Sequence, residues 1–194
     1  MGGGAMTKKT GPSSGSLTLA TLVLLLWCCS PVMVSLDYDL SADFDKYRTF
    51  DWYPGPQPKT GDVRVDSPLL DGRIRTAVTD TMLAKGYQRV NDGRPDFFLA
   101  YHLTIRSKIE ADTFNTGIGF GGYPYWGGVG YETRIREYDE GMLIVDVIDV
   151  ASDKLVWRGT GTRRVTETSD PEKTTRVVNQ TVAEILAQFP PQPK

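Results

Sequence analysis

Apolar residues recur in this chain at two different spacings, and the order of these spacings limits the folds that it can adopt. Residues 32–38 and 96–105 alternate between apolar and polar positions, which is the period of a half-buried β-strand. Two other segments repeat their apolar residues at helical spacing, in the stripes Leu70, Ile74, Val78, Met82 and Val178, Val182, Ile185, Leu186, Phe189. The chain therefore combines strands with two amphipathic helices.

Both predicted helices have sequence signals at their ends. In each, a capping residue stands directly before a proline, which is favoured at the first helical position: Ser67-Pro68 and Asp170-Pro171. Gly86 is a suitable C-terminal cap for the first helix, and Pro190-Pro191 stops the second.

Further segments have strand character: residues 48–53, 132–138, 142–150 and 155–162. The first ends at the proline-rich residues 54–58, and we expect a turn at residues 139–141 between the second and the third. The last two form a natural hairpin. A symmetrical hairpin loop places Asp146 opposite Arg158, in an ion pair worth less than about 1 kcal/mol when it is exposed.

Strands that are grouped apart from helices favour an α+β fold. We expect a largely antiparallel sheet of about five to six strands, with both helices packed on one of its faces. If residues 1–29 are a leader, residues 30–194 have a length that suits a single compact domain.

The beginning of the chain has the pattern of an export signal. Lys8 and Lys9 precede a polar spacer and the apolar run Leu17–Trp27, as in the basic and hydrophobic regions of a signal peptide. This run is about half of the roughly 20 apolar residues that a transmembrane helix needs. We interpret it as an export signal, with a membrane anchor and a buried core helix as the alternatives.

Cys28 and Cys29, the only cysteines, directly follow the apolar run and resemble the lipobox of bacterial lipoproteins. In a lipobox, the cysteine thiol takes a diacylglycerol and the cysteine becomes the new N-terminus. A small residue usually precedes the acylated cysteine, so Trp27 disfavours Cys28. Cys29 is therefore the predicted lipidation site and Cys28 the alternate, while a plain signal peptide with two incidental cysteines is the competing interpretation.

The charge pattern argues against binding to nucleic acid and against a polybasic lipid-binding segment. Removal of residues 1–29 leaves 20 basic and 24 acidic residues, a net charge of −4. Because no long run of one charge occurs, we expect neither nucleic-acid binding nor a polybasic segment that binds lipid headgroups.

The sequence predicts no catalytic residue, no metal site and no cofactor. Adjacent cysteines do not easily bridge each other, and the chain has too few cysteines and histidines for a four-ligand zinc site. His102 lies in the middle of a strand, where a lone histidine is more often structural. Asp146 and Asp149 face opposite sides of a regular strand, so they do not form a carboxylate pair. We expect a protein that is not an enzyme.

A segment rich in glycine and aromatic residues, 115–131, is the best candidate for a functional surface. Its glycines free the backbone, and its aromatic side chains offer large apolar groups: Phe120, Tyr123, Tyr125 and Trp126. Such a loop suits stacking on sugar rings, contact with lipid headgroups or binding of a partner protein. The alternative is a hairpin tip whose aromatic side chains fold back onto the sheet.

Short motifs between Leu36 and Pro191 carry a family resemblance. They include Tyr38-Asp39, Ala42-Asp43-Phe44, Tyr47-Arg48-Thr49-Phe50, Lys85-Gly86-Tyr87, Ala100-Tyr101-His102, Leu155-Val156-Trp157-Arg158-Gly159 and Phe189-Pro190-Pro191. In this combination the chain resembles a family of bacterial envelope lipoproteins known as domain of unknown function 4136. The resemblance implies export, usually with a lipobox cysteine, and it brings no established activity. Trp27 before Cys28 is the one departure from the pattern.

These features predict an exported protein on the periplasmic side of a bacterial cell envelope. We expect it to be anchored in a membrane by an N-terminal lipid and to act as a non-catalytic accessory or interaction domain. Its expected partners are the membrane and other envelope proteins or glycan. The alternative is a soluble periplasmic protein that binds a ligand or a glycan through its aromatic loop.

Overall fold

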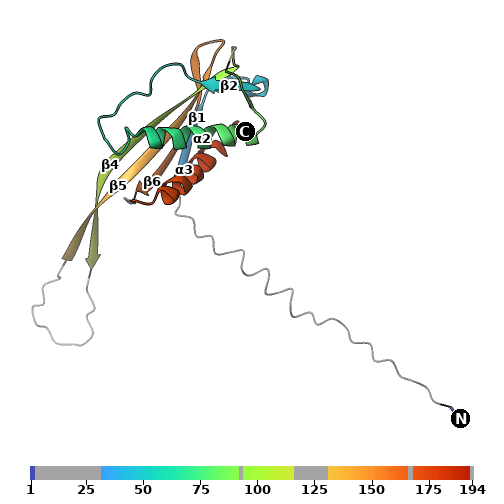
Figure 1. The fold of residues 1–194 in the computed structure, drawn as a ribbon. Coiled ribbons are helices and arrows are strands. Elements are labelled where there is room, and N and C mark those ends of the chain that lie inside the picture. Colours follow the sequence, from blue (N-terminus) through green and yellow to red (C-terminus); the bar gives the residue numbers. More distant parts are fainter. Residues whose placement is uncertain (3–31, 92–93, 116–130, 166–167, 193–194) are drawn as a thin grey trace, which may run out of the picture. The chain divides into compact units, whose positions relative to one another are not determined.

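The computed structural model describes residues 1–2, 32–91, 94–115, 131–165 and 168–192. Residues Val32–Lys194 form a compact unit. The elements of this unit, drawn in Figure 1, are β1 (Met33–Tyr38), the 3-10 helix η2 (Phe44–Lys46), β2 (Thr49–Trp52), α2 (Pro68–Ala84), β3 (Gln88–Arg89), β4 (Phe97–Asn115), β5 (Tyr131–Asp149), β6 (Lys154–Val165) and α3 (Pro171–Leu186). Among the described residues, no helix is both long enough and apolar enough to cross a membrane.

The six strands form one sheet in the order β1-β6-β5-β4-β2-β3. Strands β1, β6, β5 and β4 pair antiparallel, whereas β2 runs parallel to both β3 and β4. Figure 1 shows α2 and α3 lying across the same face of this sheet. The predicted α+β class, the largely antiparallel sheet and the two helices on one face are confirmed.

The predicted apolar stripes are the buried faces of the two helices. Helix α2 buries Ile74, Ala77, Val78 and Met82, and α3 buries Val178, Thr181, Val182, Ile185 and Leu186. They pack on apolar side chains from the strands. These side chains stand at alternate positions and so point to the same face of the sheet, as do Leu99, Val145 and Trp157. Each large aliphatic or aromatic side chain buried in this way contributes roughly 1.5–3 kcal/mol relative to an exposed one.

The helix ends follow the predicted signals with one difference. The Asp170 carboxylate accepts hydrogen bonds from the backbone N–H groups of Glu172 and Lys173, as an N-cap should. Ser67 occupies the N-cap position of α2, but within the described residues its side chain makes no capping hydrogen bond. Gly86 adopts a φ of 92° after α2 and its N–H bonds to the carbonyl of Leu83, so the predicted glycine stop is confirmed.

Aromatic rings gather where β2, β4 and the end of α3 meet. Phe97 is fully buried, and its ring centroid lies 5.2–6.0 Å from those of four others: Tyr47, Phe50, Tyr87 and Phe189. Most of these pairs are tilted or edge-to-face, which are favourable geometries for rings. Phe189, which directly precedes the Pro190-Pro191 stop of the last helix, therefore supplies a core ring.

Residues 132–149 differ from the expectation of two strands joined by a turn. They lie within the single strand β5, which pairs with β4 from Asp149 to Tyr131. Asp139 accepts hydrogen bonds from the side chains of Ser107 and Arg64, and Gly141 is buried beside Val165. The predicted turn at residues 139–141 was wrong because these polar residues have partners on β4 and on the β2–α2 loop. The short strand β3 was also missed.

Candidate functional site

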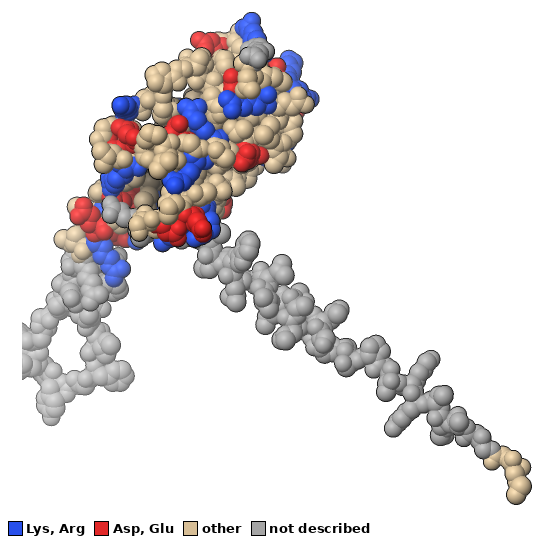
Figure 2. Space-filling view, in the orientation of Figure 1, with Lys and Arg blue, Asp and Glu red and all other residues tan. Residues whose placement is uncertain are grey.

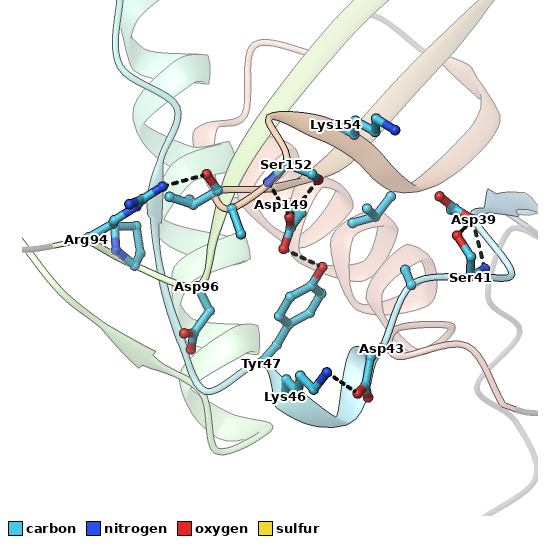
Figure 3. Close-up of a pocket in the computed structure, with 15 residues that line it drawn as sticks. Asp39, Ser41, Asp43, Lys46, Tyr47, Arg94, Asp96, Asp149, Ser152 and Lys154 are labelled. Carbon is cyan, nitrogen blue, oxygen red and sulfur yellow. Dashed lines mark hydrogen bonds and ion pairs between the residues drawn. The ribbon is translucent and has the colours of Figure 1, made fainter.

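A polar cleft lies at the end of the sheet where the β5–β6 turn approaches the segments that precede η2 and β4. It has a volume of about 580 Å³ and is drawn in Figure 3. Its charged lining residues are Asp39, Asp43, Lys46, Arg94, Asp96, Asp149 and Lys154. Figure 3 shows the Tyr47 hydroxyl directed toward Asp149.

The carboxylates of the cleft are engaged in holding the backbone. Asp149 accepts hydrogen bonds from the backbone N–H and the hydroxyl of Ser152, at 2.7 and 2.6 Å, and from the Tyr47 hydroxyl at 3.1 Å. One oxygen of Asp96 accepts hydrogen bonds from the N–H groups of Arg48 and Thr49, both at 2.8 Å. Asp149 thus fixes the β5–β6 turn, and Asp96 fixes the start of β2 against β4.

These contacts determine the charge states. Burial raises the pKa of Asp96 and of Asp149, but the hydrogen bonds that each accepts outweigh burial and leave both pKa values below the ordinary range. Burial and the neighbouring Asp149 carboxylate raise the pKa of the Tyr47 hydroxyl, which therefore stays protonated and donates its hydrogen bond. The arrangement stabilises turns and has no carboxyl group poised to release a proton near neutral pH.

A second cluster lies on the sheet face opposite the helices. As predicted, Asp146 stands opposite Arg158, and the guanidinium binds both carboxylate oxygens at 2.7 Å. The energy of this ion pair was argued for an exposed position, whereas Asp146 is only 4% exposed. His102 lies on the neighbouring strand with its Nε2 3.5 Å from Asp146. Arg158 and His102 therefore cover a buried carboxylate from two sides.

Sequence reasoning did not find the contact between His102 and Asp146. In the register, His102 pairs with Ile144 and Ala100 pairs with Asp146, so the histidine and the carboxylate are diagonal neighbours. Only the pairing of β4 with β5 brings them together, and neither residue carries a local signal of it. Asp146 and Asp149 do lie on opposite faces of β5, as predicted, since Asp149 bonds to Tyr47 on the helix side.

No group of three or more metal-binding side chains converges among the residues that the structure describes. Oppositely charged side chains are interspersed on the face that Figure 2 shows. Many charged side chains of the described residues are paired, for example Lys108 with Glu140 at 2.6 Å and Arg164 with Glu110 at 2.5 Å. An exposed pair such as Arg164–Glu110 is worth roughly 0–1 kcal/mol.

The predicted lipidation and binding residues lie outside the described residues: Cys28, Cys29, Phe120, Tyr123, Tyr125 and Trp126. The structure does describe the strands that flank the aromatic segment. Asn115 and Tyr131, which were placed in the loop, belong to β4 and β5. Strand β6 ends at Val165, opposite Asp139, and beyond that pair β4 and β5 continue as a two-stranded ribbon (Figure 1).

Several solved structures match this chain, among them a PDZ domain protein and a PelC dodecamer. A PDZ domain protein from Parabacteroides distasonis matches with a TM-score of 0.52 and 11% identity over 83% of this chain, which spans only 36% of that protein. A PelC dodecamer from Paraburkholderia phytofirmans matches with a TM-score of 0.46 and 14% identity, over 81% of this chain and 95% of that one. No curated protein matches this chain in sequence.

A family model gives a more specific result. It covers residues 34–191, which is nearly all of the compact unit and includes every strand and helix except the first residue of β1. The motifs quoted from the sequence fall within this range. The chain belongs to the family described as domain of unknown function (DUF4136).

Proposed function

We propose that this chain is an exported protein of the bacterial cell envelope, anchored by a lipid on Cys29, whose domain is a non-catalytic accessory or interaction module. The observation that carries this proposal is the leader, in which Lys8 and Lys9, the apolar run Leu17–Trp27 and the cysteine pair follow one another in the order of a lipoprotein signal. The compact unit begins at Val32, three positions after Cys29 in the sequence.

The described side chains support a role other than catalysis. In the polar cleft, the Asp149 and Asp96 carboxylates accept hydrogen bonds from backbone N–H groups. Both oxygens of Asp146 are bound by Arg158. His102, the single histidine of the chain, faces this carboxylate, which is paired with Arg158. A histidine that acts as a general base contacts a nucleophile, whereas the Nε2 of His102 lies 3.5 Å from the Asp146 carboxylate.

Replacement of Cys29 by alanine is expected to abolish lipidation, because the thiol is the only atom of that residue that can accept the diacylglycerol. The matched variant Cys28→Ala should keep lipidation, since its alanine is a suitable small residue before the modified cysteine. Lipidation is measured by metabolic labelling with a radioactive fatty acid, by the sensitivity of processing to globomycin and by the intact mass of the mature protein. Mature wild-type protein recovered from the soluble periplasm with a free thiol would contradict the proposal.

A second candidate function is binding through the aromatic segment, either to glycan or to another envelope protein. The described base of the ribbon favours it. Ile109 and Ile135 are 73% and 71% exposed, and the register makes them diagonal neighbours on one face of β4 and β5. These two exposed aliphatic side chains form a small apolar patch on the strands that lead to residues 116–130.

Replacement of both Tyr125 and Trp126 by alanine is expected to weaken capture of binding partners from a detergent extract of the envelope. Because the described core is complete without these side chains, the free energy of unfolding should change by less than about 1 kcal/mol. Quantitative pull-down and urea unfolding measure the two effects. Unchanged capture would reject the binding surface, and a large loss of stability would show instead that the aromatic side chains pack on the sheet.

A further inference from the structure

Strand β1 forms one edge of the sheet and presents a row of outward-directed peptide groups. It pairs with β6 on its inner side. The Asp39 N–H donates to the carbonyl of Val156 at 2.9 Å, which continues this ladder. Because antiparallel residues alternate between bonding inward and outward, Ser35 and Asp37 bond toward β6 like Asp39. The N–H and C=O groups of the residues between them, Val34, Leu36 and Tyr38, therefore point away from the sheet.

This edge lacks most of the features by which proteins usually prevent edge pairing, and its one charged side chain, Asp37, lies opposite Arg158 of β6. Natural edge strands are very short, bulged, or carry proline or inward-pointing charge. The opposite edge, β3, has only two residues and contains Arg89. Strand β1 has six residues in regular register and contains neither proline nor lysine. Among the described residues, no backbone hydrogen bond outside the β1–β6 ladder uses Val34, Leu36 or Tyr38.

The side chains of β1 are exposed to a degree that suits a further strand. Leu36 is 40% exposed and Met33 is 67% exposed. Val34, Leu36 and Tyr38 lie on the helix-covered face, where Tyr38 contacts the ring of Phe44. Met33, Ser35 and Asp37 lie on the other face, in register with Thr162, Thr160 and Arg158. An added strand would therefore meet an apolar row on one face and a mainly polar row on the other.

The sequence of β1 complements itself in one register. When two copies are related by a two-fold axis at Leu36, this residue faces the partner's Leu36, and Val34 faces the partner's Tyr38. All three outward-directed residues of each strand are then paired. On the opposite face, Ser35 lies across from the partner's Asp37, so a hydroxyl donor meets a carboxylate acceptor. The two Asp37 carboxylates are not directly opposite each other, which avoids like-charge repulsion.

We propose that a second copy of this chain docks on β1, antiparallel and with Leu36 on the two-fold axis, so that the two sheets join into one. The inference rests on the described edge and goes beyond the proposed membrane anchoring, since it assigns a partner to a surface. It also fixes a distance. The two Leu36 residues would exchange both of their backbone hydrogen bonds. In such an antiparallel pair the two Cα atoms lie about 5.5 Å apart, which is within the range that a disulfide spans.

Site-specific cross-linking of the full chain in detergent tests the register. In a background in which Cys28 and Cys29 are serine, L36C is expected to form a covalent dimer under mild oxidation. The matched variants S35C and D37C should give at least a fivefold lower yield, because each residue faces a different residue of the partner. No dimer from L36C, or a yield at position 35 or 37 equal to that at position 36, would overturn the proposal.

The strength of the association is tested without cross-linking. Sedimentation of the cysteine-free chain should show a dimer that L36K weakens at least tenfold in Kd, because two ammonium groups then meet on the axis. Leu69 is an exposed leucine of α2, and L69K should leave the dimer unchanged. Thermal unfolding of L36K verifies that its fold is retained. A monomeric parent chain, or equal weakening by L69K, would overturn the proposal.

Discussion

Replacement of Phe97 by alanine is expected to lower the free energy of unfolding by about 3–5 kcal/mol, the range found when a buried phenylalanine is truncated. Phe97 is the first residue of β4 and is fully buried. Its ring stands among four others, and α2, α3 and β2 each lead into this cluster. Truncation therefore removes apolar burial and leaves a cavity whose rigid aromatic walls cannot close easily.

The next residue offers a matched control. Phe98 points to the helix-free face, is half-buried and has one ring neighbour, Tyr53, at 5.8 Å. Phe98→Ala should therefore cost roughly 1–2 kcal/mol, clearly less than the loss at position 97. Phe97→Leu, which retains most of the volume, should fall between them. Urea unfolding with a common m-value measures all three, and equal losses at positions 97 and 98 would contradict the assigned faces.

The features that could be predicted from the sequence are those with a local cause. A helix declares itself through its own spacing and caps, so Asp170, Pro171 and the stripe from Val178 to Phe189 sufficed for α3. Alternation assigned Phe97, Leu99 and Tyr101 to one face of β4 in the same way. The position of Asp146 opposite Arg158 also followed, because both belong to one hairpin with a short turn.

The features that could not be predicted depend on residues far apart in the chain. Polar residues at 139–141 have the composition of a turn, and only Ser107 and Arg64 make them part of a strand. Asp146 is buried because His102 and Arg158 cover it from two neighbouring strands. The free edge at β1 requires the order of the whole sheet, including the parallel placement of β2, which alternation within a strand does not encode.

The lipidation site and the aromatic surface remain predictions from sequence. Cys29 is argued from the order of charge, apolar run and cysteine, and Tyr125 and Trp126 from composition. The described fold adds their context: a compact unit that starts at Val32, and a ribbon whose strands lead to residues 116–130. A polar cleft formed by structural carboxylates was not foreseen, because Asp96 and Asp149 meet Tyr47 only in three dimensions.

Replacement of Gly159 by alanine is expected to destabilise the protein by about 3 kcal/mol, at the upper end of the cost of overpacking. Gly159 lies in β6 beneath α3. An added Cβ atom would lie 2.6 Å from a methyl carbon of Ile185 and would overlap the ring of Trp157. Both neighbours are fully buried, so neither can move away without disturbing the core. The missing side chain is what allows α3 to approach the sheet at this point.

The same substitution at Gly72 should have the opposite sign. Gly72 is exposed inside α2, and among the described residues no heavy atom lies within 4 Å of the added Cβ. Alanine there should stabilise the helix by roughly 0.5–1 kcal/mol, because it restricts the unfolded chain and has a higher helix propensity. Thermal and urea unfolding of the two variants compare them directly. Because composition treats the two glycines alike, a similar effect at both positions would contradict the close packing of α3 on β6, and opposite signs would confirm it.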